Sequence, residues 1–172
     1  MIELERTFLL KYIPDDLREC KSGEIIDLFI PKGSRHPVLR IRKNGEVLEM
    51  TKKCPVDEND ISCQKEQTIV LSKEEYDELM KLEGKSFRKI RYYYDFNGIE
   101  SQIDVYQDAL KGLIVADFEF ETKEDKNSFE MPDFCIVEVT QEEFLAGGML
   151  CGKSYSDIEP ELRKLCYEKL FL

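Results

Sequence analysis

The feature of this sequence that most constrains its fold is an alternation of apolar and charged residues in which the charges on one face share a sign. Side chains two positions apart in a β-strand point to the same face. Glu3 and Glu5 therefore share one face of the first segment, while Leu4 and Phe8 share the other. The pattern predicts a strand that separates a charged surface from an apolar one.

Like-signed groups of this kind recur along the chain, each set against apolar neighbours: Arg40 with Arg42, Lys89 with Arg91, and Asp117 with Glu119 and Glu121. A single pair is typical of a solvated strand face. Five or six strands that all carry matched charges on one face are instead typical of a curved sheet whose charged face lines an interior. We therefore expect a charged concave interior and an apolar outside covered by helices.

The alternation predicts strands over residues 2–10, 38–42, 46–52, 61–70, 87–96, 100–106 and 113–121. Asn44-Gly45 and Asn97-Gly98 are typical of two-residue hairpin turns, which indicates an antiparallel meander. Helices are expected after the capping boxes Ser72-Lys73-Glu74-Glu75 and Thr140-Gln141-Glu142-Glu143 and over about 157–170, and a short helix is expected near Pro14. The first should end near residue 83, and the second should stop at Gly147-Gly148. No linker divides the chain, so residues 1–172 are expected to form one domain.

The charge balance excludes several classes of partner. The chain has 25 Lys and Arg against 36 Asp and Glu, a formal charge of −11, which would repel nucleic acid and anionic lipid. No apolar run approaches the ~20 residues of a membrane span, and the N-terminus lacks a basic and apolar leader, so we expect a cytoplasmic protein with no membrane or nucleic-acid partner.

The cysteines and the lone histidine indicate no zinc site. The six cysteines include no C-x-x-C pair, and His36 is the one histidine. We expect reduced, structural cysteines, and an exposed loop position for His36 in the predicted turn Arg35-His36-Pro37.

The charged motifs, taken in order, resemble those of the triphosphate tunnel metalloenzymes, also called CYTH domains. The resemblance spans about residues 2–145. It rests on Glu3-Leu4-Glu5-Arg6-Thr7 (family E-x-E-x-K), Arg40-Ile41-Arg42 (R-x-R), Met50-Thr51-Lys52 (a strand with an inward Lys), Glu66, Lys89-Ile90-Arg91-Tyr92 (K-x-R-Y), Asp104-Val105-Tyr106 (D-x-F), the segment 110–120 (L-x-G-L-x-x-A-E-x-E) and Glu138-Val139-Thr140 (E-V-T).

The resemblance implies a mainly β (α+β) fold: a closed eight-stranded antiparallel β-barrel that forms a charged tunnel, with a few flanking helices. It also implies chemistry at a small-molecule triphosphate that depends on Mg²⁺ or Mn²⁺. The residues it assigns are Arg40, Arg42, Lys52, Lys89 and Arg91 for substrate binding, Glu3, Glu5, Glu66, Asp117 and Glu119 for metal, and Glu5, Lys52, Arg91 and Asp104 for catalysis. These five cations and six acids carry a formal charge of −1, so two divalent cations would be needed to attract a triphosphate.

Two positions depart from the family pattern. Thr7 stands where the family has Lys, and Arg6 cannot replace it because adjacent strand residues point to opposite faces. Asp117 is one methylene shorter than the family Glu but is still an oxygen ligand.

The function implied first is hydrolysis of inorganic triphosphate. The alternatives are a class IV-type adenylate cyclase, a nucleoside or thiamine triphosphatase, and a non-catalytic triphosphate-binding module. Neither a homodimer nor a monomer is excluded by the sequence.

Overall fold

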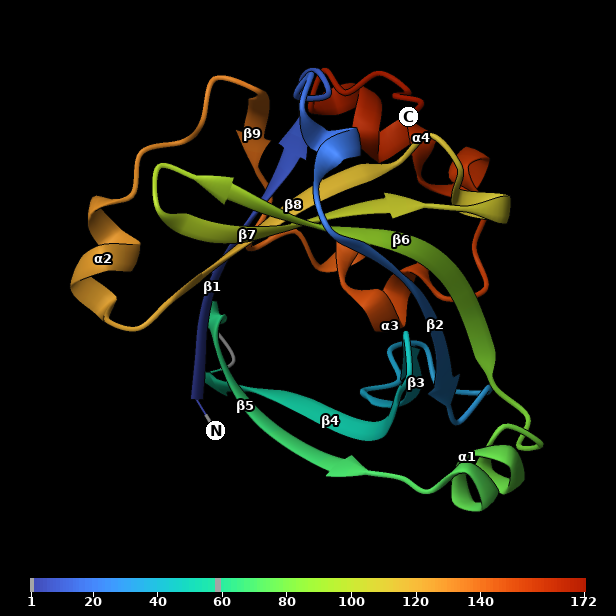
Figure 1. The fold of residues 1–172 in the computed structure, drawn as a ribbon. Coiled ribbons are helices and arrows are strands. Elements are labelled where there is room, and N and C mark those ends of the chain that lie inside the picture. The colour runs from blue at the N-terminus through green and yellow to red at the C-terminus, as the bar shows by residue number, and fades with distance from the viewer. Residues whose placement is uncertain (1, 58–59) are drawn as a thin grey trace.

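The computed structural model describes residues 2–57 and 60–172. Eight strands form a closed antiparallel barrel, which Figure 1 shows end-on. They are β1 (Ile2–Leu10), β2 (Ser22–Ile30), β3 (Leu39–Asn44), β4 (Val47–Asp57), β5 (Asp60–Val70), β6 (Lys85–Phe96), β7 (Ile99–Tyr106) and β8 (Ile114–Phe120). Their order around the barrel is β5-β4-β3-β2-β6-β7-β8-β1, and β1 pairs back with β5 to close it. A further strand, β9 (Cys135–Glu138), pairs with the end of β1. The predicted closed eight-stranded barrel is confirmed.

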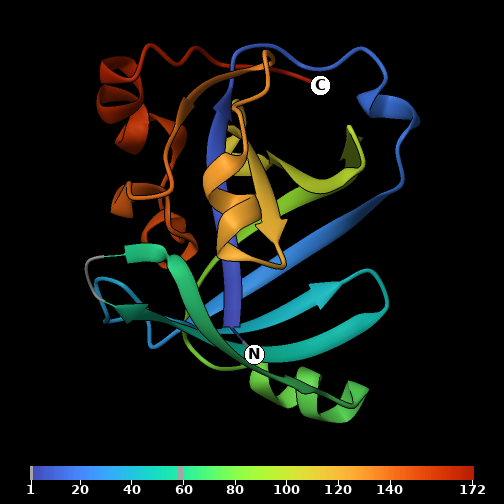
Figure 2. The ribbon, with the colours of Figure 1, turned by 90° about the vertical axis from the view of Figure 1, so that its left-hand side faces the viewer.

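The described helices lie outside the barrel strands: α1 (Lys73–Leu79), α2 (Lys123–Ser128), α3 (Gly147–Leu150) and α4 (Tyr155–Lys164), with 3₁₀ turns at Leu17–Glu19, Asp108–Leu110 and Glu143–Leu145. The predicted capping box at Ser72 is confirmed, because its side chain accepts from the backbone N–H of Glu75. Figure 2 shows the C-terminal elements, α3 and α4, gathered at one end of the barrel. None of the described helices has the length and apolar character needed to cross a membrane.

The seven predicted strands are present, but sequence reasoning missed β2, β9 and α2. β2 pairs with both β3 and β6, so the barrel depends on it. It was missed because Ile25-Ile26 and Leu28-Phe29 place apolar residues side by side and hide the alternation. Both predicted hairpins are confirmed, but the first turn is Gly45-Glu46 rather than Asn44-Gly45, because Asn44 ends β3 and pairs with Val47. Gly45, Asn97 and Gly98 adopt the positive φ typical of such turns.

The helix predicted after Thr140 is wrong. The chain forms only a 3₁₀ turn there, and Gly147-Gly148, the predicted stop, instead begins α3. Both positions require glycine because other segments of the chain approach them too closely for a side chain. A Cβ on Gly148 would lie 2.1 Å from the carbonyl oxygen of Pro37, and one on Gly147 would lie 2.9 Å from the ring of Phe29. The last predicted helix also ends at Lys164 rather than near residue 170.

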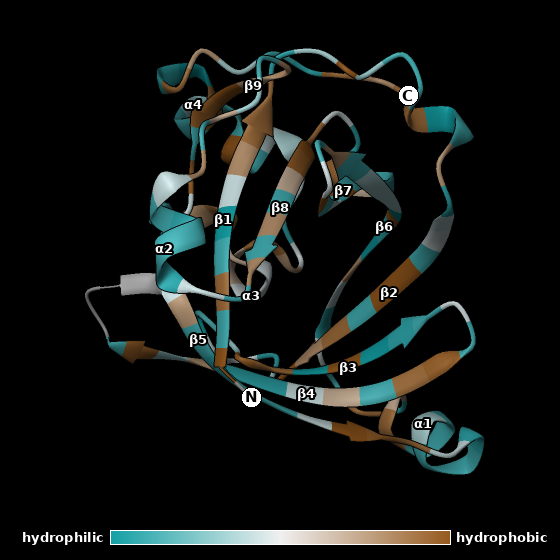
Figure 3. Ribbon diagram, turned by 60° about the vertical axis from the view of Figure 1, so that its left-hand side comes forward, coloured by the Kyte–Doolittle hydropathy of each residue, from teal (hydrophilic) through white to brown (hydrophobic). Residues whose placement is uncertain are grey.

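Two large apolar clusters hold the barrel to the rest of the chain. In one, Phe8 and Phe118 pack edge to face with Phe134 and Phe129 nearby. In the other, inward residues from one end of the barrel, including Phe29, Phe87 and Tyr106, pack with Leu150 and Leu162 of the C-terminal segment. Burying each such side chain contributes about 1.5–3 kcal/mol. Figure 3 shows polar and apolar residues alternating along the strands, so that each strand has one polar and one apolar face. One end of the barrel therefore has an aromatic floor, closed by the C-terminal segment.

Candidate functional site

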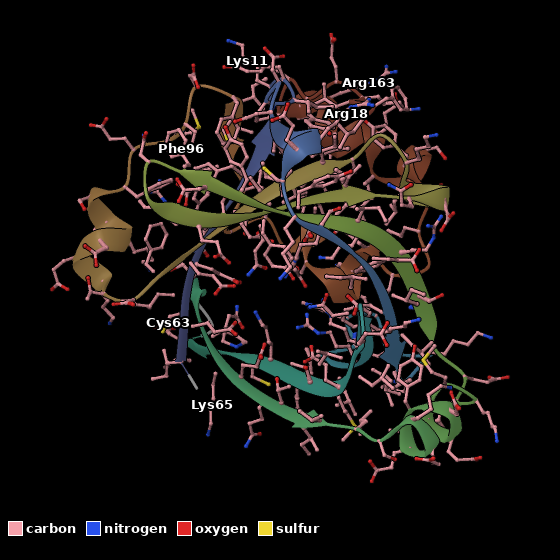
Figure 4. All side chains as sticks on the ribbon, viewed as in Figure 1. Lys11, Arg18, Cys63, Lys65, Phe96 and Arg163 are labelled. Carbon is pink, nitrogen blue, oxygen red and sulfur yellow. The ribbon has the colours of Figure 1, made fainter. Side chains whose placement is uncertain are left out.

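The barrel encloses a cavity of about 880 Å³ that receives side chains from all eight of its strands. Figure 4 shows side chains tipped with nitrogen and oxygen projecting into the lumen. The described lining includes five cations, Arg40, Arg42, Lys53, Lys89 and Arg91, and eight acids, Glu3, Glu5, Asp27, Glu49, Glu66, Asp117, Glu119 and Glu143. The charged concave interior predicted from the alternation is present, with a formal charge of −3.

Strand register explains why these residues meet. Residues directly opposite each other on neighbouring strands point to the same side of a sheet. Arg42 lies opposite Asp27 on β2 and Glu49 on β4, and Arg91 on β6 lies opposite Asp104 on β7. Each strand therefore delivers its charged face to the same interior.

The predicted inward position of Lys52 is wrong. Lys52 is exposed and lies opposite Leu39, whereas Lys53 lies opposite Glu66 and lines the cavity. The inward residues of β4 are the odd-numbered ones, because Glu49 must share a face with Arg42. The sequence holds two adjacent lysines here, and the position of Glu49 was the signal that distinguishes them.

Lys53 is the cation at the acidic part of the cavity. Its ammonium contacts a carboxylate oxygen of Glu3 and lies 3.5 Å from oxygens of Glu5 and Glu66. Burial lowers the pKa of Lys53, but Glu5 and Glu3 outweigh burial, so the net shift is upward. Lys53 is therefore charged at neutral pH and partly balances this carboxylate cluster.

Sequence reasoning missed Asp27. It is fully buried on β2, and its two oxygens accept hydrogen bonds of 2.7 Å each from Nε and Nη2 of Arg42. Burial raises the pKa of Asp27, but the charge of Arg42 and its hydrogen bonds outweigh it and bring the pKa below its usual range. A lone aspartate inside the apolar run 25–30 was the available signal.

Asp104 forms the same arrangement with Arg91, whose Nε and Nη2 donate to its two oxygens at 2.8 and 2.7 Å. Lys89 also donates to Asp104. Burial lowers the pKa of Lys89 to about 8, against the raising effect of Asp104. Asp104 itself is fully buried behind these cations and does not line the cavity. The sequence did not indicate these contacts, and the catalytic role assigned to Asp104 stays a prediction.

Arg40 is the least satisfied cation in the cavity. Its Nη2 lies 3.7 Å from Glu66, and its buried Nε has no hydrogen-bond acceptor in the part of the chain that the structure describes. Burial and the neighbouring charge of Arg42 lower the pKa of Arg40. A buried, charged donor without an acceptor favours an anion as its partner.

The carboxylates at the start of β1 and the end of β8 form an acidic cluster of Glu3, Glu5, Asp117 and Glu119. Burial is the main cause that raises the pKa of Glu5, and Asp117, Glu3 and Glu119 add to it while Lys53 opposes it. Burial and Glu3 likewise raise the pKa of Glu119. Raised values on two neighbouring carboxylates indicate negative charge that the protein leaves uncompensated.

This donor set fits a hard divalent cation, because carboxylate oxygens are the ligands that Mg²⁺ and Mn²⁺ prefer. Within residues 2–57 and 60–172, no three acidic, cysteine or histidine side chains already form a closed coordination group. Lys53 stands beside two of these carboxylates, Glu3 and Glu5, and beside Glu66 instead. Thr7, which replaces the family Lys, points into the cavity and donates a hydrogen bond of 2.7 Å to Asp117.

The closed end of the cavity combines aromatic rings with the loop before β3. Phe87 contacts Phe29 and Tyr106, and the ammonium of Lys89 lies 5.9 Å from the Phe87 ring and 5.5 Å from the Tyr106 ring. The ammonium of Lys89 therefore places a positive charge against the aromatic floor.

His36 was expected as an exposed loop residue, but it is only partly exposed and lines the cavity. Its Nδ1 lies 3.4 Å from an oxygen of Glu143.

Comparisons with solved structures show the same fold at low sequence identity. The inorganic triphosphatase NE1496 is 23% identical with a TM-score of 0.62, covering 86% of this chain and 93% of that one. A conserved hypothetical protein from Pyrococcus furiosus is 18% identical with a TM-score of 0.53, covering 73% and 83%. The PH1012 protein from Pyrococcus horikoshii OT3 is 15% identical with a TM-score of 0.52, covering 96% and 91%. No curated protein sequence matches this chain significantly.

The family comparison is more specific than these structural likenesses. The model of the CYTH domain matches residues 31–130, more than half of the chain. The matched range contains Arg40, Arg42, Lys53, Lys89 and Arg91, the five cations of the cavity. This chain therefore belongs to the CYTH domain family.

Proposed function

We propose that this protein hydrolyses inorganic triphosphate with a divalent cation inside the barrel. The observation that carries the proposal is the cavity itself, which places guanidinium groups with unused donors beside a cluster of uncompensated carboxylates. Arg40 has an unpartnered Nε, and Arg42 and Arg91 use only one edge each on Asp27 and Asp104. Forked guanidinium donors match the spacing of phosphate oxygens.

Glu3, Glu5, Asp117 and Glu119, with Glu66 on the neighbouring strand β5, would hold the Mg²⁺ or Mn²⁺. When bound, the cation supplies positive charge that draws phosphate oxygens in and offsets the charge that develops as the anhydride bond breaks. The arginines would orient the triphosphate. A carboxylate of the acidic cluster that does not bind the cation would accept a proton from the attacking water.

The shape of the lining favours inorganic triphosphate over its organic esters. The rings of Phe29, Phe87 and Tyr106 contact one another in the closed floor, and Lys89 lies against two of them. No aromatic side chain of the described lining stands beside the acidic cluster at the other end. Within this cavity a nucleobase or thiazolium ring would therefore find no stacking partner at the acidic end; the rings of Phe96, Phe120 and Phe129 line a separate pocket that, of the described residues, shares only Gln102 and Glu119 with the cavity.

A matrix of metals and substrates tests the proposal. The purified chain is incubated with Mg²⁺, Mn²⁺ or a chelator, and with inorganic triphosphate, ATP or thiamine triphosphate, while phosphate, pyrophosphate and cyclic AMP are measured. We expect phosphate release from inorganic triphosphate that requires the cation. Cyclic AMP from ATP would indicate a cyclase, faster turnover of an organic ester would indicate that class of triphosphatase, and binding without turnover would indicate a binding module.

A further inference from the structure

Asp27 places a full negative charge directly beside the arginines of the cavity. A carboxylate next to a phosphate site weakens anion binding by repulsion, so a site that needed positive charge alone would bind better without it. Asp27 is fully buried, and both of its oxygens accept from one guanidinium at 2.7 Å. Both hydrogen bonds of Asp27 therefore hold the Arg42 guanidinium in one orientation.

The geometry of the pair determines which donors Arg42 has left. A guanidinium carries five N–H groups, and Asp27 takes two of them, one on Nε and one on Nη2. Three remain, including both on Nη1. Asp27 on β2 and Arg42 on β3 lie directly opposite each other, so the register of the two strands fixes this pair of hydrogen bonds, called the fork below. Asp104 holds Arg91 by the same two nitrogens, so the arrangement occurs twice in one cavity.

We propose that Asp27 is a positioning residue that holds the Arg42 guanidinium with its Nη1 edge presented to the substrate before the substrate arrives. The role rests on the proposed function, because it needs a phosphate oxygen as the partner of that edge. Holding the side chain in advance removes the rotamer entropy that a free arginine would lose on binding. Asp27 thereby weakens the electrostatic attraction of the site for phosphate slightly, and it fixes the position of the Arg42 guanidinium.

The sign of the change in affinity separates positioning from electrostatics. Asp27→Asn removes one negative charge, keeps the shape, and turns one acceptor of the fork into a donor that faces Arg42. Glu49→Gln is the matched control, because Glu49 also lies opposite Arg42 and lines the cavity but forms no ion pair with Arg42. Electrostatics alone predicts that both variants bind triphosphate more tightly and have a higher kcat/KM for it. Positioning predicts that Asp27→Asn lowers kcat/KM for inorganic triphosphate about tenfold, while Glu49→Gln stays within about twofold of wild type or improves.

A double variant separates positioning from a general structural effect. If Asp27 acts through Arg42, then adding Asp27→Asn to Arg42→Gln changes kcat/KM by less than about twofold beyond Arg42→Gln alone. A further tenfold loss in the double variant would overturn the positioning role. Thermal unfolding of each variant shows that the assayed protein is folded.

A measurement on the wild-type chain keeps the test valid if Asp27→Asn does not fold. Nitrogen-15 NMR of the ligand-free protein should show an exchange-protected Arg42 Nε–H, assigned by its absence in Arg42→Gln. Protection that arises only after triphosphate is added overturns the inference. A wild-type chain that neither binds nor hydrolyses triphosphate overturns the proposed function as well. Activity in wild type together with Asp27→Asn behaving like Glu49→Gln overturns the positioning role alone.

Discussion

At the scale of single residues, two adjacent lysines face opposite sides of β4 and make a natural comparison. Lys53→Met leaves Glu3, Glu5 and Glu66 without their shared cation, whereas Lys52→Met changes an exposed side chain. We expect triphosphatase activity to fall about 10- to 100-fold in Lys53→Met, as for the loss of one charge-assisted contact, and to stay near wild type in Lys52→Met. Steady-state kinetics on both variants checks this. Equal loss in both would contradict the placement of Lys53.

Glu5 should show a trade between stability and activity. Its pKa in the folded protein is raised above 4.5, its ordinary value, so the stability that it contributes is present below about pH 4.5 and is lost as the pH rises through the folded value. Glu5→Gln removes the cost of keeping a buried carboxylate ionised, so this variant should unfold at a higher temperature than wild type at pH 7.

The same substitution would remove a proposed ligand of the cation, so activity should fall about a hundredfold and need more Mg²⁺. Thermal unfolding at pH 5 and pH 7 measures the effect on stability, and phosphate release at increasing Mg²⁺ concentration measures the effect on activity. A variant that is less stable at pH 7 but keeps wild-type metal dependence would show that Glu5 is a structural partner of Lys53.

At the scale of elements, α3 packs against the loop before β3 and closes one end of the cavity. Gly148→Ala places a Cβ 2.1 Å from the carbonyl oxygen of Pro37 and 2.7 Å from the ring of His36. The backbone atom cannot yield as a flexible side chain would, so we expect a loss of about 1–3 kcal/mol in the free energy of unfolding. Gly33→Ala, where nothing lies within 4 Å, is the control and should change it by less than about 0.5 kcal/mol. Urea unfolding compares the two, and equal effects would contradict the contact.

At the scale of the whole molecule, charge should make binding depend on the cation. The chain carries −11 and the described cavity lining −3, so a triphosphate meets net repulsion at both scales. We expect Mg²⁺ to tighten binding of inorganic triphosphate at least about tenfold relative to a chelator. Calorimetry on Glu5→Gln and wild type, each in both conditions, measures this. Equal affinity with chelator would mean that Arg40, Arg42 and Arg91 suffice for binding.

Much of the barrel and its lining could be predicted from local pattern. Strand alternation places Glu3 with Glu5, and Arg40 with Arg42, on the charged face of their own strand, because the side-chain period of a strand is two residues. The Asn-Gly turns join consecutive strands without reference to the rest of the fold. These features depend on residues within one strand or one hairpin, so the sequence by itself determined them.

The tertiary structure decided the features that depend on register between strands. The choice of Lys53 over Lys52 follows from the pairing of Arg42 with Glu49, and the burial of Asp27 follows from a strand whose own alternation is interrupted. The capping box at Thr140 failed for a similar reason, because the Thr140 hydroxyl accepts from the backbone N–H of Thr7 on β1 and donates to Glu138 instead. A pattern of local propensity carries no information about which distant backbone will lie against it, and those contacts determine which charges face the cavity and which end is closed.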